Sequence, residues 1–310
     1  MLKQIFFAVA LLATLGVFAY TTSRFIALFK LTRKAFPIKD IGRRIKRTLA
    51  VAFGQTRIMR KPVLGLMHAL VFWGFCVILI GSIEMVIDGL FGTERVLSFL
   101  GGFYSFITAS GDIFALIIAV TILIFLFRRV FMHVKRFSGI EMKHISHLDA
   151  NIALTMILLL MVSLMGMNTY YLLSAEHEIV WLYPVSNVLA GWIDAGESKH
   201  LLHDVNWWAH ILLIFVFANY LPYSKHFHVF MSVPNVFLSR LDPLGKVDTM
   251  ESITKEVKIM MDPDQAFAPA PEGAEEEAPE RFGVLDVEDL TWKSYMDSLS
   301  CTECGRCTSV

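Results

Sequence analysis

Five long runs of apolar residues, almost free of charged side chains, divide the first three quarters of this 310-residue chain. Their centres are Ile5–Tyr20, Val63–Ile83, Ile113–Phe127, Ile152–Met167 and Trp207–Tyr220. Extended to their flanks, four of them reach or approach the ~20 residues that cross ~30 Å of hydrocarbon. Backbone amides in lipid must be hydrogen-bonded within their own segment, so each run is expected to be a helix. The pattern predicts an all-α bundle with five transmembrane helices.

Composition agrees with a membrane protein, and charge predicts how it is oriented. Apolar residues make up 55% of the chain and the mean hydropathy is +0.56, values too high for a soluble domain. Between positions 30 and 61 there are eleven basic residues and a single acidic residue, Asp40. Five more basic residues lie between positions 128 and 143. Because basic loops stay inside, the N-terminus is predicted outside and the C-terminal region in the cytoplasm. The lipid bilayer is an expected partner, and nucleic acid is not.

The loops on the opposite side are acidic. They carry Glu84, Asp88, Glu94 and Asp112, and then Glu176, Glu178, Asp194 and Glu197. We interpret Glu84 and Asp88 as solvated loop carboxylates on the outer face, although they could also handle protons.

The C-terminal quarter has a different composition, with 16 acidic and 7 basic residues in positions 239–310. Residues 232–262 mix apolar and charged side chains and are expected to form short helices along the cytoplasmic surface. Residues 263–281 are rich in Pro, Ala and Glu and cannot bury enough apolar surface to fold, so we predict a disordered linker. Apolar side chains return in residues 282–310, which we expect to be a tethered domain that docks beside its membrane base.

Three cysteines, Cys301, Cys304 and Cys307, end the sequence in a C-x-x-C-x-x-C pattern. This pattern opens the bacterial four-iron cluster motif C-x-x-C-x-x-C-x-x-x-C-P. The fourth cysteine is expected at position 311, so residues 282–310 are the truncated start of a ferredoxin-like 4Fe-4S domain. Cys76 lies in an apolar run and cannot substitute. The alternative is a zinc knuckle or a redox thiol pair. The sequence has no histidine near these cysteines, which argues against zinc.

Histidines in or next to the apolar runs are candidate haem ligands, because a bis-histidine haem needs two imidazoles from different helices at one depth. His68 lies within two turns of the inner end of the second run, and His210 lies near the outer end of the fifth. His228 is eighteen residues after His210, which is five turns and roughly 27 Å of continuous helix. On such a helix His226 would point about 160° away from the face that carries His210 and His228. We therefore predict that His68 and His228 share a haem near the cytoplasm. Hydrogen-bonded structural histidines are the alternative.

The segments around these histidines resemble the cytochrome b (gamma) subunit of respiratory nitrate reductase. The likeness covers about residues 1–240 and includes Trp208-Ala209-His210 and the run from Pro222 to Pro234. Fusion of such a domain, residues 1–231, to a C-x-x-C-G-R-C motif is similar to membrane-bound heterodisulfide-reductase-related iron–sulfur proteins of the electron-transfer-flavoprotein:menaquinone oxidoreductase type.

This resemblance implies a quinone-reducing iron–sulfur oxidoreductase of the bacterial cytoplasmic (inner) membrane. Electrons would pass from reduced electron-transfer flavoprotein through 4Fe-4S clusters, one of them beyond residue 310, and haem b to menaquinone. One departure matters, because Ile78 stands where the resembled cytochrome has a second histidine on this helix. His210 is then left as the sole ligand of a second haem, with Met85, Met161, Met165 and His177 as poor substitutes, so one or two haems are expected.

Two other functions remain open at this stage. One is a sulfur-metabolism or heterodisulfide oxidoreductase subunit. The other is a haem-free membrane anchor, or a transporter with buried histidines. No catalytic residue is predicted.

Overall fold

Five long helices dominate the computed structural model, which describes residues 1–132, 134, 137, 143–174, 182–243, 245, 246, 249, 251–262 and 284–304. They are α1 (Leu2–Leu31), α3 (Pro62–Phe91), α4 (Gly102–Phe131), α5 (His144–Ser174) and α7 (Lys199–Tyr220). Each is part of a segment long and apolar enough to cross a membrane. No strand occurs within the described residues. The predicted all-α membrane bundle is therefore confirmed.

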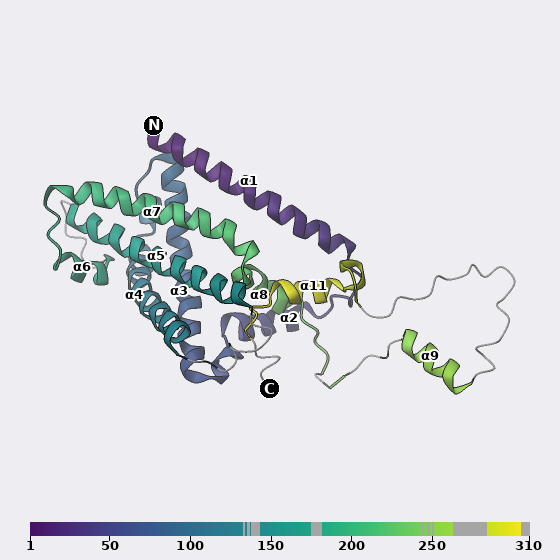
Figure 1. Ribbon diagram of the computed structural model, residues 1–310. Coiled ribbons are helices and arrows are strands. Elements are labelled where there is room, and N and C mark those ends of the chain that lie inside the picture. The colour runs from purple at the N-terminus through teal and green to yellow at the C-terminus, as the bar shows by residue number, and fades with distance from the viewer. Residues whose placement is uncertain are drawn as a thin grey trace.

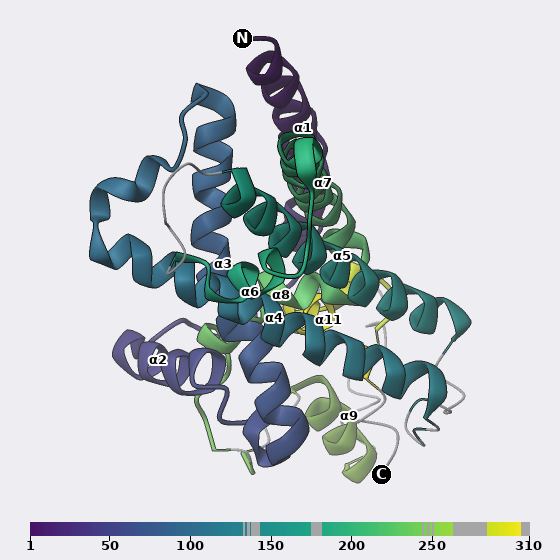
Figure 2. The ribbon, with the colours of Figure 1, turned by 90° about the vertical axis from the view of Figure 1, so that its left-hand side faces the viewer.

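The helices α1 and α7 run side by side in the same direction, as Figures 1 and 2 show. Lys3 forms an ion pair with Asp204 at one end, 2.8 Å between Nζ and Oδ2. At the other end the rings of Phe25 and Phe227 lie 5.2 Å apart. Phe25 follows Lys3 by 22 positions, which is about 33 Å of helix and close to the thickness of the hydrocarbon core. We call the Lys3 end the outer end and the opposite end the inner end, following the orientation that charge predicts.

The remaining long helices pack as antiparallel neighbours, α3 on α4, α4 on α5 and α5 on α7. A cluster of Ala115, Ile118, Ile122 and Leu160 fills the space between α4 and α5. Gly74 brings α3 close to α4, because a Cβ at this position would lie 2.8 Å from the ring of Phe114. Small residues commonly allow such close approach between membrane helices.

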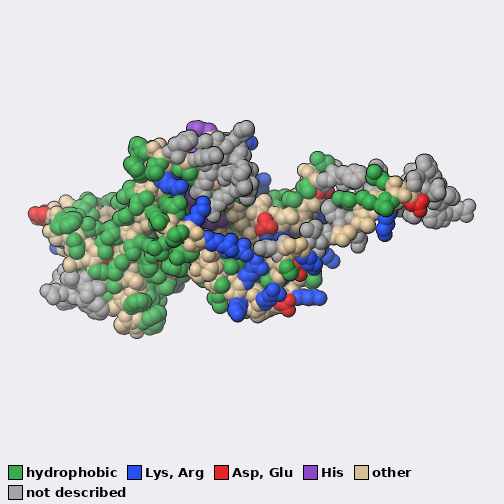
Figure 3. Space-filling model, turned by 90° about the horizontal axis from the view of Figure 1, so that it is seen from below, with side chains coloured by type: hydrophobic (Ala, Val, Ile, Leu, Met, Phe, Trp, Pro, Cys, Tyr) green, Lys and Arg blue, Asp and Glu red, His purple; other side chains and the backbone are tan. Residues whose placement is uncertain are grey.

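Short helices cover the inner end of the bundle. They are α2 (Ile41–Thr48), the π-helix η1 (Leu49–Phe53), η2 (Ile58–Arg60), α8 (His228–Phe237), η9 (Val287–Asp289) and α11 (Trp292–Leu299). The helix α9 (Glu251–Met261) stands apart from the bundle in Figure 1. The buried guanidinium of Arg44 donates hydrogen bonds to the carbonyls of Lys39, Phe237 and Ser239 and so attaches α2 to the end of α8. In Figure 3 lysine and arginine side chains gather beside a broad apolar area.

The outer end carries η3 (Val96–Leu100), α6 (Pro184–Ala190) and η6 (Gly196–Ser198). Asp112 of α4 is buried there and accepts hydrogen bonds from the backbone N–H of Val185 and of Ser186, at 2.7 and 2.9 Å. It thereby holds the first turn of α6. The prediction that Asp112 lies in a loop is wrong, because α4 begins at Gly102, ten residues before it.

The fifth apolar run ends sooner than expected. After α7 the chain forms two short 3₁₀ turns, η7 (Leu221–Tyr223) and η8 (Lys225–Phe227), separated by Ser224 in an extended conformation. Pro222 has no N–H to continue the helical ladder, and the Ser224 hydroxyl accepts a hydrogen bond from the N–H of His226 at 3.1 Å. The prediction that His210 and His228 share one face of a continuous helix is therefore wrong.

The predicted division of the chain into domains stays a prediction. The boundary at residue 231 falls inside α8, so the bundle and the juxtamembrane segment share one helix. The predicted linker, residues 263–281, lies outside the described residues.

Candidate functional site

Two histidines lie next to each other where α8 begins at the inner end. The ring centres of His226 and His228 are 5.8 Å apart. The Nδ1 of His228 lies 3.0 Å from the carbonyl oxygen of Lys225, which can only accept, so Nδ1 carries the hydrogen. The Nε2 atom then bears a lone pair, which is the arrangement typical of metal-bound histidine. The chemistry of this donor fits an axial haem ligand.

Burial keeps both of these rings neutral. It lowers the pKa of His226 to about 4 and also lowers the pKa of His228. A neutral imidazole is the form that binds a metal. His226 was predicted to point about 160° away from the ligand face, which is incorrect because the helix is broken before it. Pro222 and Ser224, both visible in the sequence, were the signals of that break.

His68 lies on the inner half of α3, six residues after the first residue of the helix, and is half-buried. It thus belongs to the same end of the bundle as His228. Its pairing with His228 around one haem stays a prediction.

The cysteine segment is docked onto this same end of the molecule, close to α8 in Figure 1. Asn235 of α8 donates to Asp297 at 3.0 Å and accepts from Lys293 at 2.7 Å. On the other side of α11, the rings of Tyr295 and Phe29 meet edge to face with centres 4.6 Å apart. Docking beside the membrane base, which the sequence suggested, is therefore observed for residues 284–304.

The described cysteines follow α11 directly. Cys301 is exposed and Cys304 is half-buried, whereas Cys307 lies outside the described residues. The N–H of Glu303 points to the Cys301 sulfur at 3.4 Å, a contact of the kind that tunes cluster thiolates. Glu303 also lies 3.8 Å from the Nζ of Lys225, the residue that precedes His226. Among described residues no three His, Cys, Asp or Glu side chains converge on one metal position. The two cysteines fit a cluster, with further ligands required.

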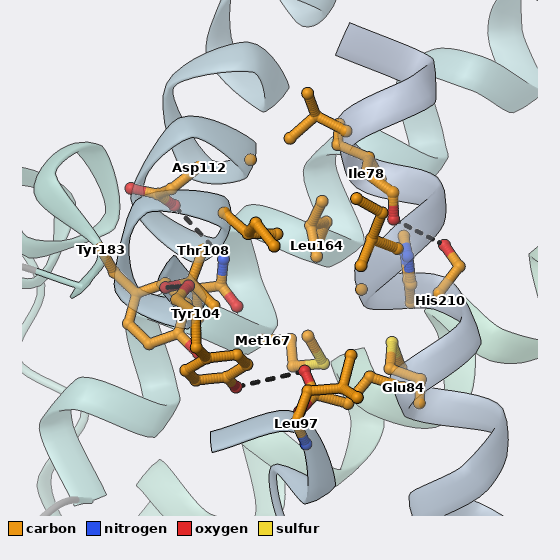
Figure 4. A pocket seen from close by; sticks show the side chains of 18 residues that line it. Ile78, Glu84, Leu97, Tyr104, Thr108, Asp112, Leu164, Met167, Tyr183 and His210 are labelled. Carbon is orange, nitrogen blue, oxygen red and sulfur yellow. Dashed lines mark hydrogen bonds between the residues drawn. The ribbon is translucent and has the colours of Figure 1, made fainter. Parts of the chain in front are cut away.

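The third predicted ligand, His210, lies in the interior of the bundle and is only 2% exposed. Its Nδ1 is 3.0 Å from the carbonyl of Leu160 and 3.0 Å from the hydroxyl of Ser163. Donation to the carbonyl leaves a lone pair on Nε2, as at His228. His210 borders a cavity of about 100 Å³ between α3, α4 and α5, which Figure 4 shows together with Ile78.

The cavity offers a haem an axial ligand, His210, on one side only. Ile78 is part of its lining, and His210 is the one histidine among the described residues around it. Met85 and Met167 also border the cavity, whereas Met161 belongs to the apolar cluster between α4 and α5. His177 lies outside the described residues. The described residues around this cavity therefore do not fit a bis-histidine haem.

A second cavity of about 350 Å³ adjoins the first and extends toward the outer end. Between them lies Glu84, 8% exposed, which accepts hydrogen bonds from the N–H of Leu97 at 2.9 Å and the hydroxyl of Tyr104 at 3.1 Å. Arg95 donates in turn to the Tyr104 oxygen at 3.2 Å. The interpretation of Glu84 as a solvated loop carboxylate is wrong, because α3 extends past it and η3 folds over it.

Two curated proteins resemble the chain. One is the probable iron-sulfur-binding oxidoreductase FadF of Bacillus subtilis (strain 168), 26% identical over 297 residues, which are 95% of this chain and 38% of FadF. The other is the EtfAB:quinone oxidoreductase of Syntrophomonas wolfei subsp. wolfei (strain DSM 2245B / Goettingen), 25% identical over 279 residues, 86% of this chain and 34% of that protein.

The chain thus spans little more than a third of the length of the curated relatives it matches. No family model matches it, and no solved structure does. Together with the cysteine motif, the two relatives show that this five-helix membrane chain is related to iron–sulfur oxidoreductases.

Proposed function

We propose that the chain is the membrane portion of an oxidoreductase that carries electrons from a cytoplasmic donor to menaquinone. The observation that carries this proposal is the docking of the cysteine segment on the turn that holds His226 and His228. Lys225 joins the two, through its ion pair with Glu303 at 3.8 Å and its place next to His226. Cofactors must be held close together for electron transfer, and this contact brings their candidate ligands together.

Specific residues would hold the redox groups. Cys301, Cys304 and Cys307 would bind the 4Fe-4S cluster, and His68 and His228 would bind haem b. When bound, these groups supply one-electron chemistry, and the protein contributes spacing and electrostatics. The carbonyl of Lys225 fixes the tautomer of His228 and the orientation of its ring. The contacts of Asn235 and Tyr295 hold the cysteine segment in one place.

The donor and the acceptor are proposed from the relatives. The name of the Syntrophomonas protein joins electron-transfer flavoprotein to a quinone, and we propose the same partners here. Reduced flavoprotein would approach the inner end, where the cysteines lie, on the cytoplasmic side of the bacterial inner membrane. Menaquinone would reach the bundle through the bilayer.

An absorption spectrum of the purified protein tests this proposal. We expect b-type haem bands that appear when dithionite is added, and an electron paramagnetic resonance signal from a reduced iron–sulfur cluster. A protein that carries the cluster but has no b-type bands would contradict the proposed route, and would favour a haem-free anchor.

A further inference from the structure

The two cavities meet inside the bundle, and their junction lies far from the cysteine segment. The inner cavity reaches His210, whereas the outer cavity reaches Lys3 and Asp204, the ion pair that marks the outer end. Six residues line both cavities: Glu84, Met85, Tyr104, Met167, Asn168 and Tyr183. The junction thus has an apolar side, from the methionines, and a polar side, from a carboxyl, an amide and two phenols.

Glu84 is placed differently from the other acids at this end. Asp88 accepts hydrogen bonds from the N–H groups of Arg95 and Val96 and so closes the turn after α3. Asp112 accepts from Ser186 and Asn168 as well as from the backbone of α6. Each oxygen of Glu84 instead accepts one hydrogen bond, and a carboxylate has about four acceptor positions. Glu84 therefore keeps capacity for a further partner in the cavity.

A chain of exchangeable groups leads from Glu84 toward the outer cavity. Its carboxyl is bonded to the hydroxyl of Tyr104, and that oxygen accepts from the guanidinium of Arg95, a residue that lines the outer cavity. A buried carboxyl changes its charge at a high cost unless a partner compensates. Arg95 supplies a positive charge one phenol away, so Glu84 can exist with and without its proton.

We propose that a quinone ring binds where the two cavities meet and that Glu84, with Tyr104, exchanges protons with it from the outer side. In quinone reduction, two electrons arrive from the cysteine end and each ring carbonyl becomes a hydroxyl by gaining one proton. Both protons enter from the outer cavity: one passes through Glu84 to one ring oxygen, and the other goes directly to the second ring oxygen. In the reverse direction the quinol loses two electrons and two protons along the same route. This inference rests on the proposed function.

Oxidation of a quinol, the reverse reaction, can be measured without the natural electron donor of the protein and therefore provides the experiment. The full-length protein in proteoliposomes is mixed with menadiol, and reduction of the b-type haem band is followed by stopped flow. Glu84→Gln keeps the size of the side chain but removes its titratable proton, and we expect it to slow haem reduction at least tenfold. Glu197→Gln, which changes an exposed acid at the outer end that lines neither of these two cavities, should leave the rate unchanged.

Two further readouts separate this inference from failures of folding and of the proposed function. Dithionite should reduce the haem of Glu84→Gln as completely as that of the parent protein. In the parent protein, a pH dye should report proton release on the Lys3 side and not on the cysteine side.

The inference is overturned if Glu84→Gln reacts with menadiol at the parent rate, or if protons appear on the cysteine side. If Glu84→Gln does not fold, Tyr104→Phe repeats the test. We expect Tyr104→Phe to slow the reaction, but by less than Glu84→Gln would. A parent protein without a dithionite-reducible haem would instead refute the proposed function.

Discussion

At the scale of single residues, the turn after α7 decides which imidazole can bind a haem. His226 and His228 lie side by side, but their Nδ1 atoms have different partners. The Nδ1 of His228 contacts a carbonyl at 3.0 Å, whereas that of His226 contacts the Ser224 hydroxyl at a longer 3.3 Å. A carbonyl fixes the tautomer and a hydroxyl does not, which favours His228 as the ligand.

Substitution of the two histidines tests this assignment. Mutation of a residue that only hydrogen-bonds to a metal ligand lowers metal affinity about 10–100-fold. Loss of the ligand itself should cost at least as much, so we expect His228→Ala to reduce haem content at least tenfold. His226→Ala should retain most of the haem, and the exposed His144→Ala serves as the matched control. Pyridine haemochrome assays on the purified variants measure the haem per chain. If haem were lost in His226→Ala and kept in His228→Ala, the ligand would be His226 and not His228.

At the scale of elements, Tyr295 makes the docking of α11 on α1 sensitive to pH. Burial raises the pKa of Tyr295 above its ordinary value. The docked state therefore keeps the phenol proton at a pH where the undocked state has lost it. Its contribution to docking is complete below about pH 10, the ordinary tyrosine pKa, and is lost as the pH rises through the higher value of the docked state.

Photo-crosslinking from a probe at position 30 of α1 to α11 measures this equilibrium. We expect the yield to decrease as the pH is raised above about 10. Tyr295→Phe should remove part of that decrease, because phenylalanine fills the same site but has no proton to lose. Identical pH curves for the two proteins would show that Tyr295 does not control the docking.

A second prediction at this scale concerns the contact of α3 with α4. Gly74→Leu would place carbon atoms within 3 Å of the side chains of Phe114 and Ile118, so the helices must separate. Overpacking of this kind costs about 1–3 kcal/mol, and we expect a lower unfolding temperature in detergent. Gly81→Ala on the same helix has nothing within 4 Å of the new methyl group and should be neutral or stabilising. Equal stability of the two variants would contradict the close packing.

At the scale of the whole molecule, the cysteine segment and the Glu84 cavities lie at opposite ends of the bundle. If quinone binds at the cavities, electrons cross most of the membrane between the cysteines and the ring. Each charge that crosses changes the reaction free energy by about 2.3 kcal/mol per 100 mV. The proposed arrangement therefore couples the redox reaction to the membrane potential.

Proteoliposomes with an imposed potential test this coupling. A potential that is negative on the cysteine side should oppose electron movement from menadiol toward the haem, and so lower the fraction of haem reduced at equilibrium. A potentiometric dye confirms the imposed potential, and its collapse should restore the reduced fraction. A reduced fraction that does not change with potential would indicate that the two redox sites lie at the same depth.

The histidine and carboxylate positions show the limits of sequence reasoning in this bundle. Hydropathy predicts where a chain enters lipid, but it does not distinguish a lipid-facing position from one that faces another helix. Glu84 and Asp112 lie at the ends of apolar runs, so they were interpreted as loop residues, and only η3 and α6 folding over them made them buried. The break at Pro222 and Ser224 was visible in the sequence, but its effect on His226 required the observed turn.

The sequence by itself determined the five crossings and the iron–sulfur motif, for a local reason. A segment in lipid must satisfy its own backbone hydrogen bonds, and a cluster needs thiolates at short fixed spacing, so both leave a signature within a few dozen residues. Only the tertiary structure decided that the cysteine segment docks beside His228 and that Glu84 joins two cavities. These arrangements depend on contacts such as Asn235 with Asp297 and Glu84 with Tyr104, whose partners lie on different helices.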